Sequence, residues 1–179
     1  MRYAEKKGIE VKSVTLLRGI NVGGHGKLPM KALCQMLEGL GAVNPQSYIQ
    51  SGNVVIEGHV EPEALTAAID AEKGFRPSVM VLSQDAFVEI AGVPPFVEPE
   101  GKLLHIWFAT APFTFDQEKA DNLRANSEAL HIGEQAIYLH APNGIGRSKL
   151  AAKIEALAGV PCTARNMNTV RKLLEMLDG

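Results

Sequence analysis

Two glycine-rich segments place basic side chains just before predicted helices. Residues 18–27 begin with Arg18, end with Lys27 and contain several glycines between them. Residues 142–149 form a second glycine-containing turn that delivers Arg147, Ser148 and Lys149 to a helix start. Backbone amides at a helix N-terminus attract anions, and guanidinium and ammonium groups add charge-assisted hydrogen bonds. The chemistry that these residues favour is noncovalent binding of a phosphate group.

Further polar side chains fall at turns and at the start of the last predicted helix. Ser51 and Asn53 lie on either side of Gly52 in a turn, and Asn21 lies inside the first glycine-rich loop. We therefore expect a ligand-binding set with these members: Arg18, Asn21, Lys27, Ser51, Asn53, Arg147, Ser148, Lys149, Arg165, Asn166 and Asn168.

The same residues also admit a structural interpretation. Glycines supply the positive φ angles of tight turns, and Asn and Gly are the usual residues of hairpin connections. Ser148 can cap one helix, and Asn166 or Asn168 can cap the last one. The first loop is not a nucleotide-binding P-loop, because that motif requires glycine at position 21 and Ser or Thr after Lys27, where Leu28 stands. Both interpretations stay open at this point.

Catalytic and metal-binding patterns are weak in this sequence. The five histidines are dispersed and show no metal-ligand spacing. No serine stands in a nucleophile elbow. Cys34 falls on a predicted buried helix stripe, and Cys162 is a single thiol beside basic residues. We assign no catalytic residue, no cofactor and no metal site.

The composition is typical of a globular protein, but the charges are segregated. The net charge is −2. Cations without acids occupy residues 11–37, and six cations against the single acid Glu155 occupy residues 141–174. This favours local anion sites over general polyanion binding. No apolar run approaches a membrane span, and two cysteines are too few for a disulfide framework. We expect a cytoplasmic protein with no membrane partner.

The hydrophobic pattern predicts the same order of elements twice. In the first half we expect a strand at 11–17, a helix after Pro29, a hairpin of 47–50 and 54–57, a helix at 61–73, a strand at 79–82 and a helix at 84–90. In the second half we expect a strand at 103–109, a helix at 116–125, a hairpin of 130–132 and 135–140, a helix at 147–157, an extended segment at 161–164 and a last helix.

This repetition predicts an α+β fold of two ferredoxin-like βαββαβ subdomains in tandem, with antiparallel sheets and helices on one face. Prolines and glycines at 94–101 indicate a linker. The predicted organisation is an N-terminal leader at 1–10, a first subdomain at 11–93, the linker at 94–101 and a second subdomain at 102–179.

Three sequence blocks carry a family resemblance. They are Leu17 to Met30 (LRGINVGGHGKLPM), Tyr48 to Val55 (YIQSGNVV), and Leu139 to Leu150 (LHAPNGIGRSKL) running on to Thr163 to Val170 (TARNMNTV). They resemble the bacterial family known as domain of unknown function 1697. The resemblance implies a pair of ferredoxin-like subdomains and no established function. Met167 and the Pro94-Pro95-Phe96 segment depart from the family pattern, which has Trp and Asn-Pro-Phe there.

The leading functional hypothesis is a module that binds a phosphate-bearing ligand, a nucleotide or a sugar phosphate, at the basic helix starts between the two halves. A second hypothesis is an enzyme acting on a small phosphorylated substrate, although the sequence offers no candidate base. A third is a nucleic-acid-binding module, which the 6% aromatic content disfavours. A fourth is that the polar motifs are purely structural and hold the subdomains together.

Overall fold

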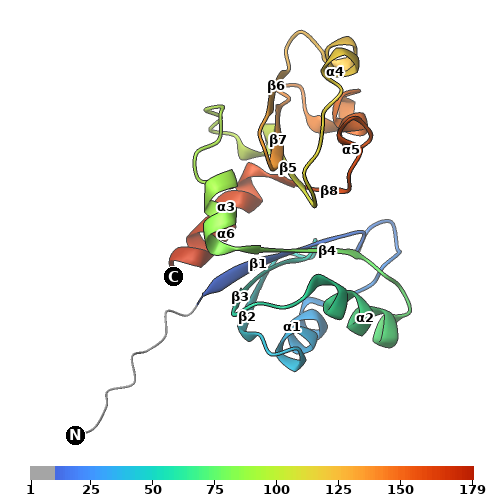
Figure 1. Ribbon diagram of the computed structural model, residues 1–179, viewed down its shortest axis with the longest axis vertical. Helices are drawn as coiled ribbons and strands as arrows, with labels where there is room; N and C mark the ends of the chain where they lie inside the picture. Colours follow the sequence, from blue (N-terminus) through green and yellow to red (C-terminus); the bar gives the residue numbers. More distant parts are fainter. Residues whose placement is uncertain (1–10) are drawn as a thin grey trace, which may run out of the picture. The chain divides into compact units, whose positions relative to one another are not determined.

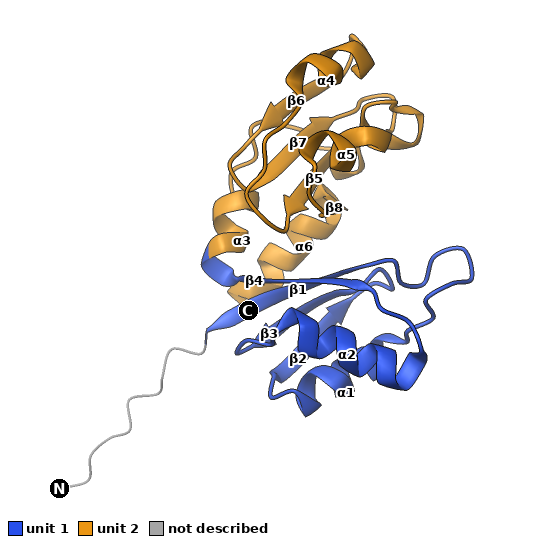
Figure 2. Ribbon diagram, turned by 45° about the vertical axis from the view of Figure 1, so that its right-hand side comes forward, with its two compact units in different colours: residues 1–85 blue, residues 86–179 orange. Residues whose placement is uncertain are grey.

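The computed structural model describes residues 11–179, and the predicted leader at 1–10 lies outside the described residues (Figure 1). The chain forms two compact units that divide between Asp85 and Ala86 (Figure 2). This division falls earlier than the predicted linker at 94–101. Unit 1 denotes residues up to 85, and unit 2 denotes residues 86–179.

Unit 1 is a four-stranded antiparallel sheet with two helices on one face. Its elements are β1 (Lys12–Arg18), α1 (Met30–Gly39), β2 (Val43–Tyr48), β3 (Asn53–Glu57), α2 (Pro62–Lys73) and β4 (Ser78–Ser83). The strand order is β2-β3-β1-β4. Apolar stripes of the two helices, including Leu33, Leu37, Leu65 and Ile69, pack into one core with strand residues such as Val54. Because these apolar residues recur three or four positions apart, α1 and α2 each have one apolar face that packs on the sheet.

Unit 2 repeats this topology with a different sequence. Its elements are β5 (Leu104–Ala109), α4 (Gln117–Leu123), β6 (Ala129–Ile132), β7 (Ala136–His140), α5 (Ile154–Ala158), β8 (Cys162–Asn166) and α6 (Met167–Asp178). The strand order is β6-β7-β5-β8, which corresponds strand for strand to unit 1. The predicted tandem α+β arrangement of two ferredoxin-like units is confirmed.

Unit 2 has helices on both faces of its sheet. On one face, Ala120 of α4 and Leu150, Ile154 and Leu157 around α5 pack in a core cluster with Trp107. On the other face, Phe87 of α3 (Gln84–Ala91) stacks on Phe108 at a centroid distance of 5.5 Å. The Tyr138 hydroxyl donates to the Ile90 carbonyl at 2.7 Å. Helix α3 therefore follows β4 in the chain but packs on the second sheet.

One predicted helix, residues 147–157, is wrong. The chain instead forms the 3-10 turns η2 (Ile145–Arg147) and η3 (Ala151–Lys153), followed by the five-residue helix α5. Ser148 is extended, with ψ at 116°, and Lys153 has φ −120° and ψ −4°, so α-helical geometry cannot run through either residue. The apolar spacing of Leu150, Ile154 and Leu157 is still used, because all three are buried.

The first strand of the first hairpin also differs in position from the prediction. Strand β2 occupies Val43–Tyr48, not 47–50, and it contains a register shift between Val43 and Gln46 against β3. Ile49 has φ 49°, a left-handed conformation that ends the strand. The remaining predicted helices and strands form within a few residues of their expected positions.

Candidate functional site

Residues 18–28, which connect β1 to the start of α1, form a small folded loop that projects past the end of β1 (Figure 1). Val22 and His25 pair in an antiparallel bridge, and the Val22 oxygen accepts from the His25 nitrogen at 2.9 Å. Gly23 and Gly24 between them have φ 57° and 78°, which suits the tight hairpin turn that glycine permits. The loop is therefore a defined structure.

The Asn21 side chain closes this loop and joins it to one other segment. Its side-chain oxygen accepts from the Leu28 nitrogen at 2.9 Å. Its side-chain nitrogen donates to the Leu28 carbonyl at 2.9 Å and to the Gln50 carbonyl at 2.8 Å. With φ 51°, Asn21 adopts the left-handed conformation that asparagine tolerates better than most residues. The amide thus holds the base of the loop and joins it to the β2–β3 turn.

The β2–β3 turn, residues 49–53, packs closely against the same loop. The Leu17 nitrogen donates to the Gly52 carbonyl at 2.8 Å. A Cβ atom on Gly52 would lie 2.7 Å from the Leu17 Cβ and 2.8 Å from the Ile20 Cδ1. Buried Asn53 donates from its side chain to the Tyr48 carbonyl at 3.0 Å and to the Ser51 hydroxyl oxygen at 2.9 Å. We call residues 18–28 and 49–53 together the loop pair.

Exposed cations lie in the loop pair and in the first turn of α1. Arg18, Lys27 and Lys31 are all exposed. Helix α1 begins after Pro29 with no side-chain cap and with no acidic residue in its first turn. The first amides of a helix have no intrahelical acceptor, and they carry partial positive charge. This end of unit 1 therefore presents positive charge and hydrogen-bond donors, which is an arrangement that can hold an anion.

Five residues of the predicted ligand-binding set lie in or beside the loop pair: Arg18, Asn21, Lys27, Ser51 and Asn53. The amides of Asn21 and Asn53 are engaged by the chain itself. The Asn21 side chain joins the two loops, whereas the Asn53 side chain donates within the β2–β3 turn. The side chains of Arg18 and Lys27, in contrast, are exposed to solvent.

The other predicted residues lie in unit 2, at one end of its sheet. Strand register places His140 opposite Leu104 and Asn166 opposite His105, so the segment after β7 and the start of α6 share that end. Arg147 and Lys149 are exposed, whereas Ser148 is buried and its hydroxyl oxygen accepts from the Ala151 nitrogen at 3.0 Å. Ser148 therefore caps the short turn η3.

At the start of α6, the Asn166 side chain accepts from the Thr169 nitrogen at 3.0 Å and forms the predicted N-cap. Asn168 packs against Gly101, where a Cβ atom would lie 2.2 Å from the Asn168 side-chain oxygen. Arg165 donates to the Ala164 carbonyl at 2.9 Å, and burial lowers the pKa of its guanidinium to about 10. Its burial makes Arg165 a less accessible cation than Arg147 or Lys149.

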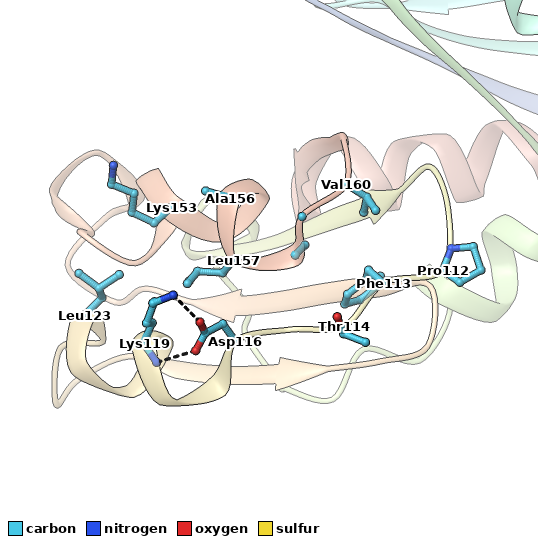
Figure 3. Close-up of a pocket in the computed structure, with 12 residues that line it drawn as sticks. Pro112, Phe113, Thr114, Asp116, Lys119, Leu123, Lys153, Ala156, Leu157 and Val160 are labelled. Carbon is cyan, nitrogen blue, oxygen red and sulfur yellow. Dashed lines mark hydrogen bonds and ion pairs between the residues drawn. The ribbon is translucent and has the colours of Figure 1, made fainter.

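Unit 2 also contains a groove that no sequence motif predicts. It has a volume of about 770 Å³ and lies between the 112–116 segment, α4 and α5 (Figure 3). Its wall residues come from positions 112–123 and 153–160, which are separated along the chain and share no motif. The sequence feature that could have indicated this groove is the apolar pair Pro112 and Phe113, which lies between the predicted strand at 103–109 and the predicted helix at 116–125.

Residues 11–179 contain no group of three His, Cys, Asp or Glu side chains that could hold a metal ion. The closest acid and histidine are Glu98 and His140, whose side-chain atoms Oε2 and Nε2 are 2.6 Å apart. Hydrogen bonds from the Glu100 backbone nitrogen and from His140 lower the pKa of the Glu98 carboxyl. Cys162 is buried, and burial raises the pKa of the half-buried Cys34 thiol. In the part of the chain described, no helix has the length and apolar character needed to span a membrane.

The fold defines the class of protein: two α+β units of ferredoxin-like topology in tandem. The family of proteins of unknown function DUF1697 matches residues 11–138, and the chain belongs to this family. The matched range contains the first two sequence blocks that carried the resemblance, and the third block, which begins at Leu139, lies beyond it.

A solved structure extends the likeness to most of the chain. The conserved bacterial protein SP0830 from Streptococcus pneumoniae is 26% identical, with a TM-score of 0.73, over 93% of this chain and 98% of that chain. None of the curated proteins matches this chain. The comparisons therefore establish family and fold, and they name no ligand.

Proposed function

We propose that this protein binds a small phosphate-bearing ligand, such as a nucleotide or a sugar phosphate, and that the loop pair of unit 1 holds the phosphate. The observation that carries the proposal is the start of α1, which has no side-chain cap and no acid in its first turn, with the exposed Lys27 and Lys31 on either side. An anion there would meet helix amides and ammonium groups together.

The hydrogen bonds of Asn21 support this proposal. They fix the base of the loop against Leu28 and Gln50, so the segment leading to Lys27 is ordered before a ligand arrives. Preorganisation lowers the entropy that binding would otherwise cost. Ile49, a β-branched residue in a left-handed conformation, lies in the same loop pair. Such backbone outliers cluster at ligand sites.

A small ligand is favoured over RNA. RNA-binding proteins of this topology stack bases on aromatic side chains of the central strands. The central strands of unit 1, β1 and β3, have the sequences KSVTLLR and NVVIE and contain no aromatic residue. We place the ligand in a bacterial cytoplasm, because the structural relative is bacterial and both cysteines are free thiols.

The test is calorimetric titration of the full chain with a panel of nucleotides, sugar phosphates and pyrophosphate. For any ligand that binds, the double variant Lys27→Ala/Lys31→Ala is expected to weaken binding by about tenfold or more, because each charged hydrogen bond contributes roughly 1.5–3 kcal/mol. Lys172→Ala is the matched control, since Lys172 is an exposed lysine of unit 2 paired with Glu175.

Two results would contradict the proposal. One is that no member of the panel binds. The other is that the double variant and the Lys172 variant bind a panel ligand as tightly as the unchanged chain. If Arg147→Ala or Lys149→Ala weakens binding while the double variant does not, the phosphate is held by the basic segment of unit 2 instead.

A further inference from the structure

The groove of unit 2 is a concave site with mainly apolar walls. Pro112, Phe113, Leu123, Leu157 and Val160 supply apolar surface, and Figure 3 shows them on both sides of the hollow. Its volume of about 770 Å³ lies in the range of small-molecule sites, roughly 300–1,000 Å³. Size and lining together suit a ligand with an apolar body.

The walls of the groove are held in place without a ligand. The Asp116 nitrogen donates to the Leu157 carbonyl at 3.2 Å, which joins the start of α4 to α5. Thr110 donates from its backbone nitrogen, at 3.1 Å, and from its hydroxyl, at 3.0 Å, to the Pro161 carbonyl, which joins the two segments beyond the other end. Phe113 and Leu123 pack against the core cluster of Trp107 and Ile154. The groove is therefore preformed.

The charged groups of the groove leave one cation uncompensated. The Lys119 ammonium lies 2.8 Å from the Asp116 carboxylate, and this pairing raises the pKa of Lys119 and lowers the pKa of Asp116. Lys153 lies across the groove on the α5 side, with its ammonium pointing away from that pair (Figure 3). Lys153 has no acidic partner within residues 11–179. A ligand in the groove would meet apolar walls and one positive charge at the rim.

We propose that this groove binds a small amphiphilic anion, a medium-chain carboxylate whose hydrocarbon part lies along Phe113, Leu157 and Val160 and whose carboxylate lies at the rim near Lys153. The apolar part supplies most of the affinity, because removal of apolar surface from water is the dominant favourable contribution to such binding. The rim cation selects an anion over a neutral alcohol of the same length. This site is separate from the loop pair and does not depend on phosphate binding there.

The test is calorimetric titration of the full chain with octanoate and with 1-octanol. Lys153→Glu is expected to weaken octanoate binding roughly fivefold, in keeping with the modest effect of an exposed charge, and to leave octanol binding unchanged. Lys149→Glu is the control, because Lys149 is an exposed lysine of the same segment that does not line the groove. Ala156→Trp fills the groove from an exposed helix position and is expected to weaken both probes at least about tenfold.

The proposal fails if octanoate does not bind the unchanged chain, or if Ala156→Trp, shown to be folded by circular dichroism, still binds octanoate fully. Equal loss of octanoate affinity in Lys149→Glu and Lys153→Glu would also overturn it, since a general charge effect would then explain the selectivity. The Lys27→Ala/Lys31→Ala variant is expected to bind octanoate as the unchanged chain does. This separates the outcome from that of the phosphate proposal.

Discussion

Asn21 shows how one side chain can hold a loop in a defined conformation. Its amide forms hydrogen bonds with both backbone groups of Leu28 and with the Gln50 carbonyl. Asn21→Gly keeps the left-handed backbone accessible but removes all three bonds. We expect the free energy of unfolding to fall by about 2–3 kcal/mol, from roughly 1 kcal/mol for each lost bond. Urea denaturation measures this change.

A matched control exists in the same unit. Asn44 has φ 50°, but within residues 11–179 its exposed side chain makes one hydrogen bond, to the Glu57 carboxylate at 3.2 Å. Asn44→Gly is expected to change stability by less than about 0.5 kcal/mol, as is usual for surface positions. Equal effects of the two substitutions would mean that the Asn21 bonds do not hold the loop.

His105 links the stability of unit 2 to pH. It lies on β5 with its Nδ1 atom buried and without a hydrogen bond among the described residues. Burial lowers its pKa to about 4 from an ordinary value of 6.5. The unfolded chain therefore takes up a proton at a higher pH than the folded chain does. The contribution of neutral His105 to the free energy of unfolding is therefore complete above pH 6.5, and it is lost as the pH falls toward 4.

The size of this loss is expected to be about 1–2 kcal/mol, since His105 retains partial exposure that screens the effect. His105→Gln removes the titrating group, so the free energy of unfolding should vary less between pH 6.5 and 4 than in the unchanged chain. His59→Gln, at an exposed histidine of unit 1, is the matched control substitution. A steeper profile in the His105 variant would contradict this assignment.

At the scale of turns and helices, two glycines differ in the space around them. Gly52 is closely packed, whereas Gly39 is not. Gly52 has φ 83°, and an added Cβ would approach Leu17 and Ile20 within 2.8 Å. Gly39, at the end of α1, has no atom within 4 Å of such a Cβ. We expect Gly52→Ala to lower the free energy of unfolding by about 2 kcal/mol or more, and Gly39→Ala to raise it by about 0.5–1 kcal/mol. Thermal and urea unfolding of both variants would reveal this opposite sign.

The sequence predicts an element well where one physical signal dominates. Helix α1 has a clean stripe of Met30, Leu33 and Leu37, all buried, and it forms as expected. The 147–157 segment has an equally regular stripe, yet Ser148 and Lys153 leave α-helical geometry there. Buried contacts of Leu150 and Ile154 are satisfied by short turns as well as by a helix. Apolar spacing therefore fixes which residues are buried and leaves the local backbone undetermined.

The residue types of the candidate site are visible in the sequence, but the contacts that join its two loops are not. The glycines and cations of residues 18–27, and the polar residues of the turn at 51–53, are the sequence features that predict a ligand-binding segment. The bond from Asn21 to Gln50, 29 residues away, depends on tertiary structure that no local pattern contains. The unit 2 groove was missed for the same reason, because its walls come from segments whose proximity follows only from the fold.

At the scale of the whole molecule, the repeated topology does not by itself assign a function to either unit. Both units have the same strand order, but the candidate phosphate loops belong to unit 1 and the apolar groove to unit 2. Function must be argued from each site separately. Two ligand sites of different chemistry are therefore compatible with one duplicated architecture.

The whole chain has a net charge of −2, so a polyanion would be repelled by most of its surface and attracted only locally. A small phosphorylated ligand held by one or two cations should lose less than about tenfold in affinity between roughly 50 and 200 mM salt. A nucleic acid contacting six or more phosphates should lose about a hundredfold or more. Titration of the best panel ligand and of a single-stranded RNA at both salt concentrations discriminates these cases. Tight RNA binding with the steep dependence would replace the small-ligand proposal with a nucleic-acid-binding one, and it would require the cations of the loop pair to act along an extended backbone.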